Sequence, residues 1–280
     1  MWVLIALLIN LEFYNVVSKK SVGLDDFSSA LKNFHVVRVM GGQDIRMRYK
    51  RSKMGPFWIT ISMAVMIATM GLVFGNLFKT DVKEFLPYLT LGLITWSFIL
   101  SSISEGCDAL ISSEGIIKQL PVPLHVHVMR VIWKNLIIFL HNIVILPFVL
   151  LAVGKGLSWT ALLAVPGFLL LILNLTWLLM ILSMICARFR DMTQIVLSIM
   201  QVIFYLTPVI WMPKLLSHRA GELLLNLNPL YHLIDLVRSP LLGTMPMVSS
   251  YIVAIVMAVV GLTASIAMTS KYKYRVPYWV

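Results

Sequence analysis

The densest run of chemically active side chains in this sequence is basic. Between residues 46 and 53 it contains Arg46, Arg48, Lys50, Arg51 and Lys53. Guanidinium groups bind phosphate through two parallel hydrogen bonds, and ammonium groups bind it as point charges. The run stops at Gly55-Pro56, immediately before a long apolar stretch. We therefore expect the run at a membrane interface, where its cations contact lipid phosphates and help to fix the topology.

The histidines do not form a catalytic or metal-binding pattern. His125 and His127 are separated by one residue, so they do not share one face of a helix. His232 and Asp235 are close enough in sequence to touch, but no nucleophile accompanies them, which favours a structural polar pair. The sequence has no H-E-x-x-H motif, and its 2 cysteines are isolated from each other and from histidine. We predict a protein that is not an enzyme and binds no metal.

The sequence also lacks the parts of an energy-converting site. It has no G-x-x-x-x-G-K-[ST] loop to hold ATP phosphates. Ion-coupled transporters usually carry ionisable residues inside their spans, but most of the long apolar stretches contain no Asp, Glu, Lys or Arg. His141, beside Asn142, is more typical of a hydrogen bond between helices than of a proton relay. Either the chain is a passive channel, or a partner supplies the energy and this chain needs no cofactor.

The elements that must position these residues are membrane-spanning helices. The chain is 59% hydrophobic and 12% charged, whereas soluble domains carry about 25% charged residues. A hydrocarbon core about 30 Å thick needs about 20 apolar residues in a helix. We predict an all-α integral membrane protein with six spans. Their approximate bounds are Phe57–Phe78, Phe85–Ser104, Val131–Val153, Trp159–Ala187, Met192–Met212 and Val248–Ser270.

Positive charge is distributed unequally between the two sides of these predicted spans. Of the 23 lysines and arginines, 17 fall on the side of the N-terminal segment and 6 on the other side. Cytoplasmic loops of membrane proteins carry the excess of Lys and Arg, so both termini are predicted to be cytoplasmic. An even number of spans agrees with this orientation.

Residues 1–54 are predicted to form a cytoplasmic or interfacial segment that precedes the membrane domain of residues 55–280. Residues 1–9 are apolar but too short to span, and fit either a surface anchor or a stretch outside the fold. Further along, helical spacing predicts an amphipathic interface helix with Asp25 or Asp26 as its cap and a break at Gly41-Gly42. Its apolar face consists of Phe27, Ala30, Leu31, Phe34 and Val37.

The stretch between predicted spans five and six, residues 214–246, is too polar to span and too apolar for an ordinary loop. The apolar spacing of residues 223–227 predicts one short helix, and Pro229 opens a second. The apolar face of the second helix consists of Leu230, Leu233, Ile234, Val237 and Leu241. Two short amphipathic helices divided by Asn228-Pro229 predict a re-entrant hairpin that dips into the outer leaflet.

Four segments carry a resemblance to a known family. The first is the pattern R-Y-x-x-S-x-x-G-P-x-W, here Arg48-Tyr49, Ser52, Gly55-Pro56 and Trp58. The others are SSEGIIKQLPVPLHVHVMR (Ser112–Arg130), ARFRDMTQIV with YLTPVIW (Ala187–Val196 and Tyr205–Trp211), and NPLYHLIDLVRSPLLG (Asn228–Gly243). In this order they resemble type-2 ABC exporter permeases, most closely those that export lipid-linked polysaccharides. Gln119 and Val122 depart from the lysine and phenylalanine that are frequent in the family.

The resemblance implies a homodimer of this chain with two cytoplasmic ABC ATPase subunits, which bind ATP and Mg. It implies export of undecaprenyl-diphosphate-linked polysaccharide of the O-antigen type across the bacterial inner membrane. The basic run, Arg46 to Lys53, would then bind the lipid diphosphate. The alternatives are a type-2 permease for another lipid or drug, a membrane-embedded enzyme of lipid-linked glycans, and a passive channel.

Further roles follow from the resemblance. ATPase coupling is expected at a short cytoplasmic helix, for which an ordinary loop is the alternative, through Glu114, Ile117, Lys118 and Leu120. The gate hairpin is expected to use Asn228, Pro229, Tyr231 and Asp235. Aromatic side chains suit a sugar channel because sugar rings present apolar faces, although they suit the interface belt or the core as well. The candidates are Tyr88, Trp96, Phe98, Trp177, Phe204, Tyr205 and Trp211.

Overall fold

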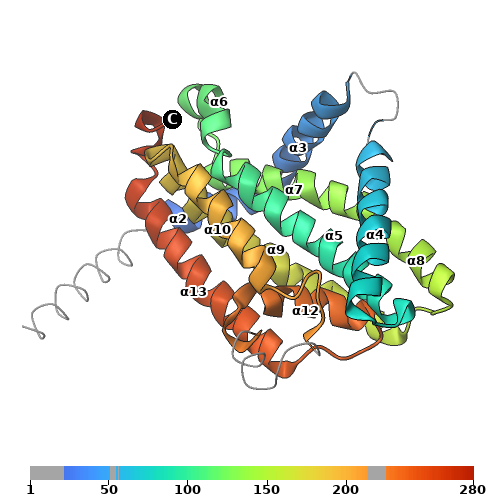
Figure 1. Cartoon of the computed structure of the whole chain (residues 1–280). Coiled ribbons are helices and arrows are strands. Elements are labelled where there is room, and N and C mark those ends of the chain that lie inside the picture. Colours follow the sequence, from blue (N-terminus) through green and yellow to red (C-terminus); the bar gives the residue numbers. More distant parts are fainter. Residues whose placement is uncertain (1–21, 51–54, 56, 214–224) are drawn as a thin grey trace, which may run out of the picture.

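Long helices dominate the computed structural model, which describes residues 22–50, 55, 57–213 and 225–280 (Figure 1). Its regular elements within those ranges are all helical, so the all-α prediction is confirmed. Among the described residues, five helical stretches are long and apolar enough to cross a membrane. They are α4 (Phe57–Phe78), α5 (Val82–Cys107), α7 (Leu124–Ile143) with α8 (Ile145–Val153), η2 (Trp159–Leu163) with α9 (Ala164–Arg188), and α13 (Val248–Tyr272). The apolar start of the chain lies outside the described residues.

The predicted fifth span is shorter in the structure. Helix α10 (Met192–Leu206) is apolar but has 15 residues, fewer than the roughly 20 that a span needs. It stops because Pro208 disfavours the helical region for the residue before it, and Thr207 is extended, with φ −90° and ψ 134°. The prediction of a helix through Met212 is wrong, and a sixth membrane crossing stays a prediction.

The third span is longer than predicted and consists of two helices. Helix α7 begins at Leu124, well before the predicted start at Val131. The histidine-rich stretch therefore belongs to the helix rather than to a loop. The change from α7 to α8 falls at Val144. Pro147 has no N–H to donate to the carbonyl of Ile143, so the helical hydrogen-bond ladder is interrupted there.

Helices α5 and α9 lie at the centre of the bundle. Most residues of α5 are buried, whereas α4 buries only Ile67, Gly71 and Gly75. Helix α9 packs against α5 and against α13. Gly92 of α5 allows the segment after α10 to approach, because a Cβ atom at this position would lie 2.7 Å from the Val209 carbonyl oxygen. This close approach places Val209 against α5.

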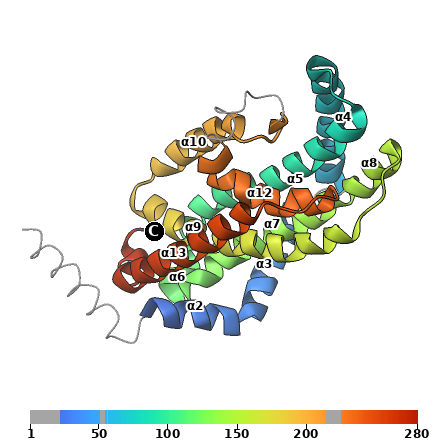
Figure 2. The ribbon, with the colours of Figure 1, turned by 90° about the horizontal axis from the view of Figure 1, so that it is seen from below.

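Two amphipathic helices, α2 (Val22–Lys32) and α3 (Phe34–Tyr49), cover one side of the bundle. Figure 2 shows them on the side opposite to α10. Their apolar side chains Ala30 and Val37 are buried with Val126 and Met129 of α7. The two helices are thus attached to the third span by a small hydrophobic cluster, and their position at a membrane interface stays a prediction.

The turn between α2 and α3 does not lie at the predicted position. Helix α3 continues through Gly41 and Gly42, so the predicted break there is wrong. A Cβ atom at Gly41 would lie 3.1 Å from the Arg130 carbonyl oxygen, which indicates that this glycine serves close packing on α7. The chain turns at Asn33 instead, whose side-chain amide donates to the Ser29 carbonyl at 2.9 Å.

Helix α12 (Pro229–Leu241) is the second helix of the predicted hairpin and begins where predicted. The Asn228 Oδ1 atom accepts hydrogen bonds from the backbone amides of Leu230 and Tyr231, at 3.0 and 3.2 Å. Pro229 suits the first helical position because it has no N–H to satisfy. Of the predicted first helix, residues 223–227, the structure describes residues 225–227, which are helical, and the remainder lies outside the described residues. The re-entrant hairpin therefore stays a prediction.

Candidate functional site

The basic run begins on the last turn of α3, which places Arg46 and Arg48 on the helix and Lys50 directly after it. Arg48 Nη1 lies 3.6 Å from Glu105 Oε1 at the end of α5. Arg46 instead lines a cavity of about 470 Å³ between α3 and α7. Arg51 and Lys53 lie outside the described residues. The cations that are described thus face two different surroundings.

Glu105, near the end of α5, connects three helices. The sequence did not predict this role. Its carboxylate lies 2.8 Å from Lys134 Nζ and accepts a 2.7 Å hydrogen bond from Asn135 Nδ2, both on α7. With Arg48 it joins α3, α5 and α7. One feature of the sequence could have indicated this contact. Glu105 immediately follows the second predicted span, and Lys134 lies near the same membrane surface in the third predicted span.

The cavity beside Arg46 is lined mainly by polar and basic side chains of α3. His35, Arg38 and Gln43 lie along it, and Trp133 of α7 forms its far wall. The Arg38 guanidinium carbon lies 5.9 Å from the centroid of a Trp133 ring, within range of a cation–π contact. This cavity combines cationic side chains with an aromatic ring, which suits the binding of an anionic headgroup at an interface.

The predicted coupling helix is present as α6 (Glu114–Gln119), preceded by the short helix η1 (Ile111–Ser113). Lys118 Nζ lies 2.6 Å from Glu114 Oε1, and this ion pair lowers the pKa of the Glu114 carboxyl. The same ammonium group donates to the Val280 carbonyl at 2.8 Å. Ile117 is half-buried, whereas Leu120 is 56% exposed. Figure 1 shows α6 standing out from one end of the bundle, next to the C-terminal residues.

Asp26 is a buried carboxylate near α6 that the sequence analysis expected only as a cap of its own helix. It lies inside α2 and caps α7 instead: its oxygens accept from the backbone amides of Leu124 and His125, at 3.1 and 3.0 Å. His125 Nδ1 and Lys273 Nζ lie 2.8 and 2.7 Å away. Burial alone would raise the pKa of Asp26, but the hydrogen bonds from His125 and Lys273 outweigh it and hold the pKa at about 2. Asp26 thereby joins α2, α7 and the end of α13.

Four of the seven candidate channel aromatics gather where α10 meets α5. The ring centroids of Trp96 and Phe204 are 5.3 Å apart, and those of Phe204 and Tyr205 are 5.4 Å apart. Trp211 Nε1 donates to the Tyr205 carbonyl at 3.1 Å. Tyr205 is exposed on the outward face of α10. Within this group, Tyr205 is therefore available to a neighbour outside the single chain, whereas Trp96 is buried.

The other three candidate aromatics have different surroundings. Phe98 is buried against Phe139 and Phe168 in the core of the bundle. Trp177 packs on the α9–α13 contact, where its indole N–H donates to Asn174 Oδ1 at 3.0 Å. Tyr88 lies at the end of the bundle that is opposite to α6, beside α12.

Helix α10 presents an exposed stripe of polar side chains. Gln194, Ser198, Gln201 and Tyr205 are all exposed, and their spacing places them on one helical face. The rest of α10 is strongly apolar. Lipid tails offer hydrogen-bonding groups no partners, so polar side chains in spans tend to face other helices or water. The stripe marks a face that is suited to contact with a partner or a passage.

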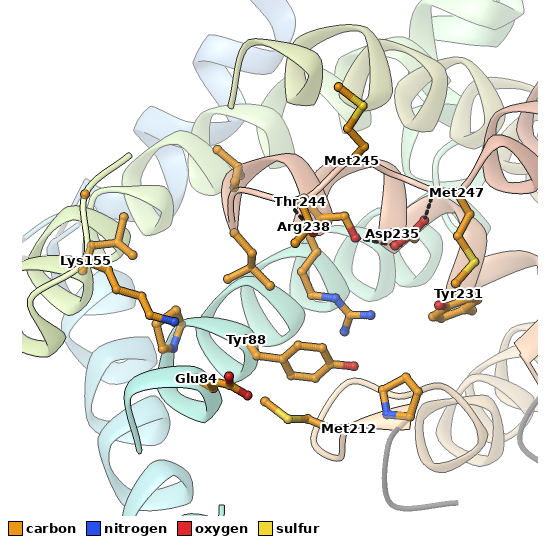
Figure 3. A pocket seen from close by; sticks show the side chains of 17 residues that line it. Glu84, Tyr88, Lys155, Met212, Tyr231, Asp235, Arg238, Thr244, Met245 and Met247 are labelled. Atoms are coloured by element: carbon orange, nitrogen blue, oxygen red, sulfur yellow. Dashed lines mark hydrogen bonds between the residues drawn. The ribbon is translucent and has the colours of Figure 1, made fainter. Parts of the chain in front are cut away.

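The end of the bundle opposite to α6 holds a cavity of about 420 Å³ lined by α5, α12 and the loops beside them (Figure 3). Arg238, which the sequence analysis did not single out, is 3% exposed there. Its guanidinium carbon lies 4.0 Å from the centroid of the Tyr88 ring. The Pro208 carbonyl accepts from both Arg238 Nη1 and the Tyr88 hydroxyl, at 2.7 and 2.9 Å. These bonds join α12 to α5 through the segment that follows α10.

The predicted gate residues hold this end of the bundle together. Asp235 accepts from the hydroxyls of Ser239 and Ser250, at 2.5 and 2.8 Å, and from the Met247 amide at 3.2 Å. Asn228 Nδ2 donates to Thr207 Oγ1 at 2.8 Å, which ties the start of α12 to the end of α10. Asp235 and Tyr231 both line the cavity, so two of the four predicted gate residues lie beside Arg238.

The sequence is similar to those of known proteins. The family described as ABC-2 type transporter matches residues 35–242. O-antigen export system permease protein RfbA from Myxococcus xanthus is 25% identical over 193 residues, which cover 68% of this chain and 74% of that protein. A protein of the same name from Klebsiella pneumoniae is 24% identical over 251 residues, which cover 86% of this chain and 93% of that protein.

Proposed function

Because this chain belongs to the ABC-2 type transporter family, we propose that it is the transmembrane subunit of an exporter for O-antigen-type polysaccharide linked to undecaprenyl diphosphate. The carrying observation is its similarity to O-antigen export permeases over 93% of the length of one of them. The chain is a transport permease rather than an enzyme. ATP and Mg are bound in this proposal by two separate ATPase subunits.

The ATPase subunits dock on α6. This helix lies at one end of the bundle (Figure 1), and the hydrogen bond from Lys118 to the Val280 carbonyl attaches it to the C-terminal segment. The exposed Leu120 side chain and the half-buried Ile117 give it an apolar contact surface. Glu114 and Lys118 stabilise the helix through their i, i+4 pair. Movement of the ATPase would reach α7 and α13 through Asp26, which bonds to both.

A second copy of the permease covers α4 and α10. These two helices bury few of their residues within one chain. Figure 2 shows both on the side of the bundle opposite to α2 and α3. The polar stripe of α10 and the aromatic group around Phe204 would then line the passage between the copies. Sugar rings have apolar C–H faces that pack on aromatic rings, and hydroxyls that bond to glutamine and serine.

The lipid diphosphate is received at the end that carries α6. Arg46 faces the open groove beside Trp133, whereas Arg48 is held by Glu105. We assign diphosphate contact to the basic run Arg46, Arg48, Lys50, Arg51 and Lys53, in which Arg46, Arg48 and Lys50 are exposed. This end is cytoplasmic in the proposal, following the excess of Lys and Arg on it. Helices α2 and α3 lie at the inner surface of the bacterial inner membrane.

A complementation experiment in cells tests the proposal. The full chain is expressed with and without its cognate ATPase in a strain that lacks its own O-antigen permease, and surface polysaccharide is measured. Export that requires both proteins supports the proposal. Export by the permease alone favours a passive channel. A functional pair that restores drug or simple-lipid export, but never surface polysaccharide, favours a type-2 permease for another cargo.

A further inference from the structure

The cavity at the end opposite to α6 contains Arg238, a nearly buried cation that forms no ion pair with any described residue. From it we infer that this cavity binds a sugar residue that carries a carboxylate, within the exported glycan. The inference rests on the proposed export of a polysaccharide and specifies the chemistry of one sugar that the permease recognises. It concerns Arg238, Tyr88, Tyr231 and Lys155, which line the cavity.

Arg238 is the central observation. Its side chain is almost wholly buried, yet within the described part of the chain it forms no ion pair. One nitrogen donates to the Pro208 carbonyl, and the guanidinium group lies over the Tyr88 ring. A buried cation without an anionic partner is costly. An anionic ligand in the adjoining cavity would remove this cost.

Asp235, the carboxylate on the same helix, bonds to other groups and forms no ion pair with Arg238. Its two oxygens accept hydrogen bonds from two serine hydroxyls and from a backbone amide. Figure 3 shows the Arg238 guanidinium between Tyr88 and Asp235, facing the cavity. A guanidinium group has five N–H donors in a planar fork that matches a carboxylate. Arg238 lines the cavity and has further N–H groups besides the one that donates to the Pro208 carbonyl.

The remaining walls suit a sugar rather than a lipid phosphate. Tyr231 contributes an aromatic ring, and Thr244 and Ser239 contribute hydroxyls at the rim. The lining contains two basic side chains, Arg238 and Lys155, and two acidic ones, Glu84 and Asp235. The two carboxylates would repel a diphosphate more strongly than a monoanion, because repulsion grows with the charge of the ligand. The volume of about 420 Å³ is within the usual range for small-ligand sites.

Direct binding to the purified full-length chain in detergent micelles tests the inference. The probes are glucuronate, glucose and inorganic phosphate, followed by ligand-observed NMR and calorimetry. We expect glucuronate to bind, and glucose and phosphate to bind at least about tenfold more weakly, because a charge-assisted bidentate contact is lost or mismatched. Equal binding of glucose, or stronger binding of phosphate, would overturn the assignment.

Two variants locate the site. Arg238→Met keeps the apolar stem and removes the charge, and we expect it to weaken glucuronate binding about tenfold or more. Thr244→Trp blocks the rim from an exposed position and removes no buried group, so it keeps the test valid if Arg238→Met fails to fold. Arg275→Met, an exposed arginine on the C-terminal segment, is the matched control and should bind glucuronate as the unmodified chain does.

The outcomes separate this inference from the proposed function. Folded Thr244→Trp protein that still binds glucuronate normally would place binding elsewhere and overturn the inference. The assay contains no ATPase and measures no transport. Absence of export in the complementation experiment would therefore refute the proposed function. It would not change the result of the binding measurement.

Discussion

Arg48 Nη1 lies 3.6 Å from Glu105 Oε1, so the last turn of α3 is held against the end of α5 by opposite charges. Lys134 of α7 lies 2.8 Å from the other carboxylate oxygen. Glu105 thus sits between cations from two helices. A change of charge at Arg48 on α3 would therefore alter the electrostatic environment of both α5 and α7, whether or not Arg48 contacts the transported molecule.

Reversing the charge at Arg48 and Arg51 together should impair export several-fold and leave assembly intact. Glutamate at position 48 would face Glu105 and repel it, and the basic run would lose two of its five cations. The measurement is surface polysaccharide in cells that also contain the ATPase, with permease abundance in the membrane measured in parallel. Arg275→Glu, which changes an exposed arginine on another segment, is the control. Normal export by the double variant would reduce these arginines to topology signals.

Removing the Asp26 carboxylate should destabilise the fold. Breaking a buried ion pair costs about 3–5 kcal/mol, and because Lys273 keeps access to water we expect Asp26→Ala near the lower end, about 3 kcal/mol. The measurement is the free energy of unfolding in detergent. Asp25→Ala is a closely matched control, since Asp25 is the adjacent residue and is exposed. Equal effects of the two substitutions would contradict the assigned role of Asp26.

The contribution of Asp26 should depend on pH only in acid. Its pKa of about 2 lies below the ordinary value of 3.8. A carboxyl with a lowered pKa stabilises the folded state fully above its unfolded pKa and loses that contribution as the pH falls through its folded pKa. The stability difference between the unmodified chain and Asp26→Asn should therefore be constant from about pH 9 to 5 and shrink between about pH 4 and 2. A difference that changes around neutral pH would implicate another group.

The exposed end of the coupling helix should be required for ATPase docking. Leu120→Asp places a charge on the apolar surface of α6, and we expect the amount of ATPase that copurifies with the permease to fall by about tenfold or more. Permease abundance should not change, because Leu120 is exposed. Leu157→Asp, at an exposed leucine in the loop before η2, serves as the control. Undiminished copurification of the ATPase with Leu120→Asp would move the docking surface away from α6.

Tyr205 and Phe98 should behave differently although both were candidate channel aromatics. Tyr205 is exposed on α10, so Tyr205→Ala should reduce export with little loss of stability. Phe98 is buried between Phe139 and Phe168, and Phe98→Ala should lower the free energy of unfolding by about 3–5 kcal/mol. Thermal unfolding and surface polysaccharide are measured on both variants. A stable Phe98→Ala protein with a specific export defect would argue that Phe98 lines the passage.

Much of the fold was predictable because hydrophobicity and length define membrane helices. The bounds of α4 agree with the prediction, and Asn228-Pro229 marked the start of α12 through its capping chemistry. The errors have local causes. Pro208 ends α10 earlier than predicted. His125, His127 and Arg130 lower the hydropathy of the first turns of α7, so these turns were predicted as a loop. Hydropathy alone does not reveal where either helix boundary lies.

The sites were less predictable, because their key groups come together only through tertiary contacts. Asp26 resembled a cap of its own helix, but it caps a helix about one hundred residues further along the chain. Arg238 lies in a helix whose apolar periodicity is regular, and only the approach of Tyr88 and Pro208 shows that it is buried. The aromatic candidates were chosen by residue type, which does not distinguish Tyr205 on the surface from Phe98 in the core.

The Pro208 carbonyl oxygen accepts hydrogen bonds from both Tyr88 and Arg238. One atom therefore fastens α5 and α12 to the segment that follows α10. Any displacement of this carbonyl would weaken both hydrogen bonds at once, so the contacts of α5 and α12 with this segment are coupled.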